Sequence, residues 1–209
     1  MEDVLEVYAR PRDPQRPLVC LDEFCKQLIG EAREVLPAQP GQPVRQDYEY
    51  VRHGMCSVIM AYGPLESWRE VRVTGQRTAR DYAQTLRWLC DEVYPHADKI
   101  VLVQDNLNTH TPASLYEAFP PAEALRLKER IEWHYTPKHG SWLNMAEIEI
   151  GVAQRQCLSR RLARKTIVEQ ELLQWSKDRN AANASTDWQF TTADARIKLK
   201  RLYPSSTQE

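Results

Sequence analysis

Short runs of apolar residues, separated by turn signals, dominate the first third of the chain. Residues 18–21 are all apolar and end in Asp22-Glu23, which predicts a buried strand. Three further strand-like runs lie at residues 48–52, 55–62 and 68–74. His53-Gly54 and Gly63-Pro64 separate these runs, and because such pairs favour turns, the pattern predicts an antiparallel meander.

Helical and strand patterns alternate in the rest of the chain. Thr78 and Asp81 have the spacing of a capping box, which predicts a helix that ends at Pro95. Residues 99–103 form the strongest central-strand pattern, and residues 131–135 form another strand. Helical patterns cover residues 122–130, 141–161, 167–183 and 194–202. This order predicts an α/β protein in which helices pack on both faces of a mixed sheet.

Composition places the chain among ordinary globular proteins. Of its 209 residues, 42% are hydrophobic and 27% are charged, which argues against a disordered chain. No apolar run reaches eighteen residues, so no membrane-spanning helix is expected. The five cysteines are odd in number and form no CxxC pair, which predicts reduced thiols rather than a disulfide framework or a zinc site.

The charge is divided unevenly along the chain, although the net charge is only −1. From residue 150 onward there are 11 Lys and Arg against 6 Asp and Glu, whereas the preceding residues carry 17 against 23. The protein therefore has an acidic body and a basic C-terminal part. An acidic body repels a polyanion such as DNA unless cations lie between them.

Three carboxylates are candidates for one site. Asp22 and Asp105 lie at the ends of predicted buried strands, and Glu147 lies near the start of a predicted helix. Because strands of an α/β sheet deliver their carboxyl ends to one crevice, these side chains can meet there. Divalent cations with oxygen ligands offset the repulsion between such carboxylates. A turn at Asp105-Asn106 or a solvated surface acid is the alternative that these residues leave open.

Two long motifs resemble the catalytic core of IS630-family transposases, which belong to the wider group of Tc1/mariner elements. Residues 101–110 read VLVQDNLNTH, and residues 134–147 read HYTPKHGSWLNMAE. The resemblance extends to Leu21-Asp22-Glu23 and to the tail at residues 188–196, so it covers nearly the whole chain. It implies an RNase H-like α/β fold, with a mixed five-stranded sheet and helices on both faces.

The resemblance also implies a DDE active site that binds two Mg²⁺ or Mn²⁺ ions. Its first Asp falls on Asp22, its second on Asp105 and its Glu on Glu147. Glu149 lies two positions along the same helix, about 200° away, so only one of the two glutamates can face the site. Glu149 is then either exposed to solvent or paired with a nearby base.

Several further residues have candidate supporting roles. His110 orients a water, a phosphate or a carboxylate, or it makes a cap or loop hydrogen bond, and Asn106 lies beside it. Lys138 and His139 contact phosphate or shape a loop, Asn144 orients Glu147, and Trp142 is expected in the core. The candidate DNA-binding residues are Arg155, Arg160, Arg161, Arg164 and Lys165, with a second basic cluster at Arg196, Lys198, Lys200 and Arg201.

These features together predict a metal-dependent transposase catalytic domain over residues 1–209, with a basic helical part from about residue 150. Its expected partner is double-stranded DNA, at element ends and target, bound by a homodimer in the bacterial cytoplasm and nucleoid, with no membrane contact. The seventeen residues before the first strand are too few for an N-terminal helix-turn-helix domain. The alternatives are a non-catalytic fragment that binds DNA or regulates a full-length transposase, and a general RNase H-like nuclease.

Overall fold

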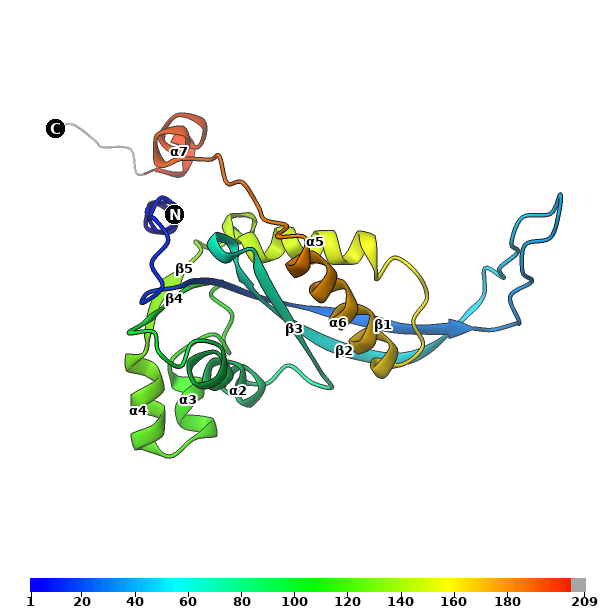
Figure 1. The fold of residues 1–209 in the computed structure, drawn as a ribbon, viewed down its shortest axis with the longest axis horizontal. Coiled ribbons are helices and arrows are strands. Elements are labelled where there is room, and N and C mark those ends of the chain that lie inside the picture. Colours follow the sequence, from blue (N-terminus) through cyan, green and yellow to red (C-terminus); the bar gives the residue numbers. More distant parts are fainter. Residues whose placement is uncertain (204–209) are drawn as a thin grey trace.

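Five strands form one mixed sheet in the order β3-β2-β1-β4-β5 (Figure 1). The computed structural model describes residues 1–203. The strands are β1 (Leu18–Glu31), β2 (Tyr50–Gly63), β3 (Trp68–Thr74), β4 (Ile100–Gln104) and β5 (Ile131–Tyr135). β2 pairs antiparallel with β1 and with β3, whereas β4 pairs parallel with β1 and with β5. The predicted mixed five-stranded sheet is therefore confirmed.

Helices cover both faces of this sheet, as predicted. The α-helices are α1 (Glu2–Tyr8), α2 (Ala79–Trp88), α3 (Ala113–Ala118), α4 (Pro121–Glu129), α5 (Met145–Gln156), α6 (Lys165–Ala181) and α7 (Thr192–Lys198). Three short 3₁₀ helices are η1 (Pro64–Glu66), η3 (Ser141–Leu143) and η4 (Lys200–Leu202), and η2 (Leu89–Val93) is a π-helical segment that follows α2. One hydrophobic cluster joins the sheet to α5 and α6, and a second joins the opposite face to α2, α3 and α4. The segment 112–130, which contains α3 and α4, therefore packs on the face of the sheet opposite α5.

The capping box predicted at the start of α2 is present. The Thr78 side chain accepts a hydrogen bond from the Asp81 N–H, and the Asp81 carboxylate accepts one from the Thr78 N–H. Two short helices, α1 and α3, have no counterpart among the predicted elements. α1 and α7, from opposite ends of the sequence, share a small cluster around Leu5, Leu143 and Ala195.

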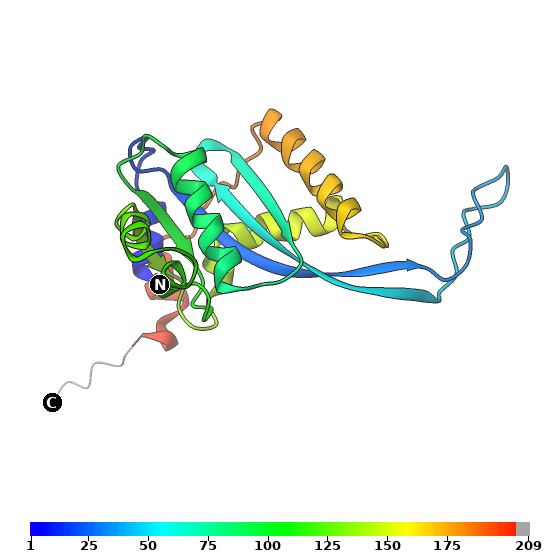
Figure 2. The ribbon, with the colours of Figure 1, turned by 90° about the horizontal axis from the view of Figure 1, so that it is seen from below.

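A long two-stranded arm departs from the prediction. The runs predicted at 48–52 and 55–62 are one strand, β2, and β1 extends ten residues beyond the predicted run at 18–21 to end at Glu31. The two strands project well beyond the body (Figures 1 and 2). His53 and Gly54 stand opposite the single residue Leu28, with Gly54 at φ +91°. Gly54 thus forms a β-bulge within a strand, and the predicted turn at His53-Gly54 is wrong.

Replacing Gly54 with alanine is expected to lower the free energy of unfolding by about 1–2 kcal/mol, because a side chain is strained at positive φ. A Cβ at this position would meet no heavy atom within 4 Å, so the loss comes from the backbone alone. Urea unfolding monitored by circular dichroism measures the effect. Gly75→Ala is the control, because Gly75 also has open space around it but no positive φ. Equal stability of the two variants would contradict this interpretation of the bulge.

All five cysteines are free, and Cys20, Cys56 and Cys90 are buried. Among residues 1–203, no helix combines the length and the apolar character needed to cross a membrane.

Candidate active site

Asp22 lies on the central strand β1, just beyond the point where the parallel neighbour β4 ends. β1 pairs with β4 through Leu18 to Cys20 and then continues past the end of β4, paired only with β2. Asp22 is therefore within β1 rather than at its end, which corrects the prediction. Its side chain is nearly buried and accepts hydrogen bonds from the Glu23 N–H at 2.8 Å and from Asn144 Nδ2 at 3.3 Å.

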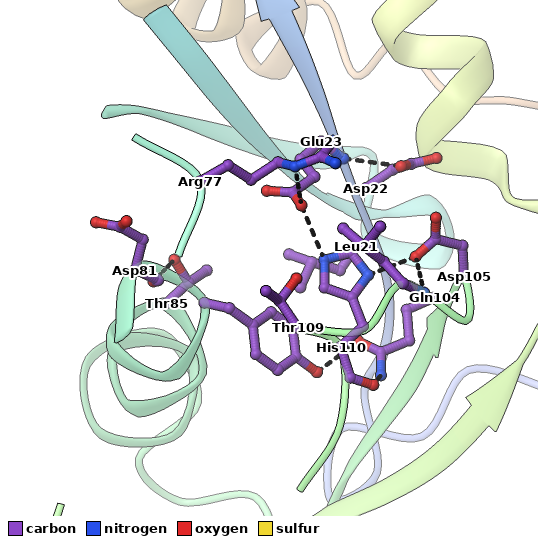
Figure 3. A network of polar contacts seen from close by, with 12 residues as sticks. Leu21, Asp22, Glu23, Arg77, Asp81, Thr85, Gln104, Asp105, Thr109 and His110 are labelled. Carbon is purple, nitrogen blue, oxygen red and sulfur yellow. Dashed lines mark hydrogen bonds and ion pairs between the residues drawn. The ribbon is translucent and has the colours of Figure 1, made fainter. Parts of the chain in front are cut away.

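Asp105 reaches the same edge from the neighbouring strand. Cys20 pairs with Val103, so Asp22 and Asp105 each lie two residues beyond the last paired positions of adjacent parallel strands. Such residues are lateral neighbours, a few ångströms apart across the sheet. Asp105 Oδ1 accepts a hydrogen bond from the Leu107 N–H at 3.1 Å and lies 2.5 Å from His110 Nδ1 (Figure 3).

Glu147 approaches from the helix that covers this face of the sheet. Asn144 caps α5, because its Oδ1 accepts the Ala146 N–H and its carbonyl accepts the Glu147 N–H. Glu147 is exposed in the first turn of α5, and with Asp22 it lines a hollow of about 310 Å³. The same hollow is lined by Ile150, Gly151 and Gln154 of α5. The structure thus brings Asp22 next to each of the other two predicted acids.

The electrostatics of the site reflect this crowding. Burial, together with the negative charges of Asp105 and Glu147, raises the pKa of Asp22 to about 6, against the opposing hydrogen bond from the Glu23 N–H. Asp105 is also partly buried, but its contact with His110 lowers its pKa. Burial alone would lower the pKa of His110, yet Asp105 and Glu23 outweigh it and raise that pKa to about 9. His110 therefore offsets part of the negative charge, and Asp22 is the acid left short of a cation.

The donor chemistry fits a hard divalent cation, since Asp22, Asp105 and Glu147 offer only carboxylate oxygens. Within residues 1–203, no group of three His, Cys, Asp or Glu side chains is gathered closely enough to form a metal site. The acids are therefore neighbours in the structure without being drawn together around one point. A cation beside Asp22 would offset the repulsion that the other two carboxylates exert on it.

The predicted supporting residues separate into two groups. Asn144 is fully buried and Asn106 is exposed, yet both hold the framework: Asn144 contacts Asp22 and caps α5, and Asn106 donates to the Thr136 carbonyl at 2.6 Å. His110 binds the Asp105 carboxylate, as one of its two interpretations predicted. Lys138 and His139 instead line a separate cavity with Trp142.

Trp142 is not in the core, where it was predicted. It is 44% exposed, and its ring packs edge-on against Phe190 at a centroid distance of 5.6 Å. Leu143, the next residue, is fully buried and takes the place in the core. A buried position in this turn was therefore predicted correctly, but it was assigned to Trp142 instead of Leu143.

Glu149 is buried rather than exposed to solvent. Its carboxylate is 1% exposed and pairs with Arg69 at 3.0 Å and with Arg179 at 2.9 Å. Arg69 comes from β3 and Arg179 from α6, so the cluster joins three elements. Of the two interpretations of Glu149, pairing with a base is confirmed, and Glu147 is the glutamate that faces the hollow.

The predicted DNA-binding residues differ in how far their charges are already balanced. Arg160 pairs with Glu171. Arg161 pairs with Glu31 at 2.7 Å and donates to the backbone carbonyls of residues 47–49, just before β2. For Arg155, Arg164 and Lys165, no ion pair is present among residues 1–203. Their contribution to DNA binding stays a prediction.

Two residues at the site have no role in the sequence prediction. Glu23 and Arg77 form an ion pair whose closest atoms are 3.2 Å apart, and Glu23 also faces His110 (Figure 3). Glu23 stood in the quoted motif beside Asp22, which was the only signal for it. Arg77 lies between β3 and α2, and no sequence pattern connects it to β1.

Comparison with known proteins identifies similar sequences and folds. The sequence profile of the family described as DDE superfamily endonuclease matches residues 17–168. Among solved structures, the Mos1 mariner paired-end complex with Mn aligns with a TM-score of 0.53 at 19% identity, covering 86% of this chain and 54% of that chain. This likeness and the strand order confirm the predicted RNase H-like fold.

Other solved structures align less well. A pre-cleavage Mos1 transpososome gives a TM-score of 0.38 at 14% identity, covering 88% of this chain and 60% of that chain. The Drosophila P element transposase strand transfer complex gives 0.33 at 12% identity, covering 94% and 52%. This chain thus spans about half to three fifths of the length of these proteins. No match was found among curated protein sequences.

Proposed function

Because the chain belongs to the DDE superfamily endonuclease family, we propose that it is the catalytic domain of a DNA transposase. It cuts DNA at the ends of a mobile element and joins the freed 3′-OH to target DNA. The observation that carries this proposal is the register of β1 and β4, which sets Asp22 beside Asp105 with Glu147 across the hollow. The narrower assignment to the IS630 branch stays a prediction.

Asp22, Asp105 and Glu147 are the residues that would hold two Mg²⁺ or Mn²⁺ ions. Such ions polarise a phosphodiester and stabilise both the attacking and the leaving oxygen. The negative charges of both other acids act on Asp22, so it is the natural ligand to be shared. Asn144 orients the Asp22 carboxylate through Nδ2, and His110 orients that of Asp105. Both contacts fix carboxylates before DNA arrives, which lowers the cost of ordering them during the reaction.

The basic residues after the catalytic helix supply a contact surface for the DNA backbone. Arg155 lies in the last turn of α5, and Arg164 and Lys165 begin α6, all without carboxylate partners in the described part of the chain. Arg155 and Arg164 are exposed. Lys and Arg at such positions bind phosphates without reading the base sequence. We assign the DNA affinity of this domain chiefly to these three residues, and we propose that it acts as a homodimer on two element ends.

Replacing both Arg155 and Arg164 with alanine is expected to weaken DNA binding and to reduce its salt dependence. Each lost phosphate contact flattens the plot of log affinity against log salt by about 1, so the slope changes by about 2. Fluorescence anisotropy with a labelled duplex, between about 50 and 200 mM salt, measures it. Arg126→Ala is the control, because Arg126 pairs with Asp91 and Glu123 on the opposite face. An unchanged slope in the double variant would remove these residues from the interface.

A plasmid assay tests the proposed function. The protein is incubated with supercoiled DNA in Mn²⁺, in Mg²⁺ and in EDTA, and separately with a pre-cut element end and a target plasmid. We expect nicking and end joining only with a divalent cation. Nicking without joining supports a general nuclease instead, and no reaction under any condition supports a non-catalytic fragment.

A further inference from the structure

One buried carboxylate at the site has no part in the proposed chemistry. Asp22 and Glu23 are consecutive residues of β1, so their side chains point to opposite faces of the sheet. Asp22 faces α5, whereas Glu23 faces the side covered by α2 and is only 4% exposed. A carboxylate is costly to bury without a charged partner. The burial of the Glu23 carboxylate therefore has to be offset by charged partners.

The partners of Glu23 connect it to the second catalytic acid. Its Oε1 lies 3.2 Å from Arg77 Nε and 3.4 Å from His110 Nε2. The other ring nitrogen of His110, Nδ1, lies 2.5 Å from Asp105 Oδ1. Figure 3 shows this chain of side chains running from Arg77 through Glu23 and His110 to Asp105. It joins the segment before α2, the central strand and the loop after β4.

His110 is held in place from further directions. Its ring stacks on the Tyr82 ring at a centroid distance of 4.7 Å, and its carbonyl accepts a hydrogen bond from Gln104 Nε2 at 3.0 Å. Gln104 Oε1 in turn accepts from the Tyr82 hydroxyl at 2.6 Å. The imidazole is only 2% exposed. Because both ring nitrogens face a carboxylate, a rotation of the ring away from Glu23 would also move Nδ1 away from Asp105.

Both contacts on Asp105 are made to the same carboxylate oxygen, which leaves the other oxygen free for a ligand. Both the Leu107 N–H and His110 Nδ1 bind Oδ1. The rotation of the carboxylate is thereby fixed, and Oδ2 is the oxygen left for a cation. Hydrogen bonds to a ligating carboxylate from residues around it are a recognised way to orient it for a metal ion.

We propose that Glu23 is a positioning residue for Asp105, acting through His110, with Arg77 as the counter-charge that keeps Glu23 in place. This inference rests on the proposed function, since it assigns Asp105 as a cation ligand. Glu23 is then not an additional ligand, although it adjoins Asp22 in the sequence. Arg77, which is 40% exposed, connects the segment before α2 to the catalytic edge of the sheet.

The test measures Mn²⁺ binding and nicking in parallel. Binding to the intact protein is followed by the electron paramagnetic resonance signal of free Mn²⁺, which needs no DNA and no turnover. Glu23→Gln and Arg77→Ala are expected to weaken Mn²⁺ affinity about 10- to 100-fold, the usual effect of removing the partner of a metal ligand. Arg77→Lys retains the charge and restores most of the affinity.

The two variants are also combined. In the Glu23→Gln background the charge that Arg77 balances is gone, so Arg77→Ala has little additional effect, and the double variant resembles Glu23→Gln alone. Glu31→Gln and Arg80→Ala are matched controls. Glu31 is an ion-paired glutamate of the same strand, and Arg80 is an exposed arginine three residues after Arg77. Both controls should bind Mn²⁺ as the wild type does.

Two results would overturn the proposal. One is an unchanged Mn²⁺ affinity in Glu23→Gln and Arg77→Ala, even where their unfolding temperatures fall, because a merely structural pair gives that pattern. The other is full additivity of the two substitutions. Failure of the proposed function looks different: Asp105→Ala itself then leaves Mn²⁺ binding and nicking unchanged. If Asp105→Ala abolishes both and Glu23→Gln neither, only the positioning role is lost.

Discussion

Replacing Asp105 with alanine is expected to abolish metal-dependent nicking of plasmid DNA. The substitution removes one proposed cation ligand and leaves His110 without its partner on Nδ1. A bound cation stabilises the transition state of phosphodiester cleavage by several kcal/mol. Since about 1.36 kcal/mol changes a rate tenfold, we expect a loss of about 10³-fold or more. The rate of conversion of supercoiled to open-circular plasmid in Mn²⁺ measures it.

Asp98→Ala is the matched control for this experiment. Asp98 is an exposed aspartate just before β4, at the end of that strand opposite Asp105. It should nick DNA at the wild-type rate. Retained nicking in Asp105→Ala, with both proteins equally folded, would remove Asp105 from the active site.

The second large effect separates the two glutamates of α5. Glu149→Gln is expected to lower the free energy of unfolding by about 3–5 kcal/mol, because it leaves the buried Arg69 without its charged partner. Glu147→Gln makes the same chemical change two residues earlier, on an exposed side chain. It should leave stability nearly unchanged and abolish nicking. The two substitutions therefore have opposite expected effects on folding and on activity.

Urea unfolding at constant pH measures the stability of both variants, and the plasmid assay measures their activity. Nicking by Glu149→Gln is recorded at a temperature where the variant remains folded, and it should be retained. A stable Glu149→Gln would show that the Asn180 side chain and the Ala184 carbonyl, which accept hydrogen bonds from the Arg69 guanidinium, satisfy it by themselves. An active Glu147→Gln would remove Glu147 from the proposed site.

The candidate site could be predicted from the sequence because its geometry follows from the sheet. Apolar runs identified β1 and β4, and parallel pairing of two such strands brings the acids that follow them to one edge. The assignment of Glu147 needed the motif as well, since helical spacing alone showed only that one of the two glutamates faces the site. The position of Asp22 within β1 could not be predicted, because the strand continues into the arm with polar residues that lack the apolar pattern of a buried strand.

The residues that the sequence did not assign are those whose partners lie far away along the chain. Arg69 and Arg179 turn Glu149 inward, and Glu31 takes up the charge of Arg161, although in each case the sequence pattern was that of a solvated surface. Gly54 carried a turn signal because a bulge requires the same backbone freedom. Hydrophobic periodicity indicates which face of a helix or strand is apolar. It does not indicate which polar side chains are paired with residues far away along the chain.

Asp22, Asp105 and Glu147 are proposed to bind divalent cations together. Crystals of the protein soaked in Mn²⁺ and measured at a wavelength where manganese scatters anomalously test it most directly. We predict an anomalous peak between Asp22 and Asp105, with Glu147 turned toward it. A soaked crystal with no peak at this edge of the sheet, or with a peak that none of the three carboxylates contacts, would contradict this assignment.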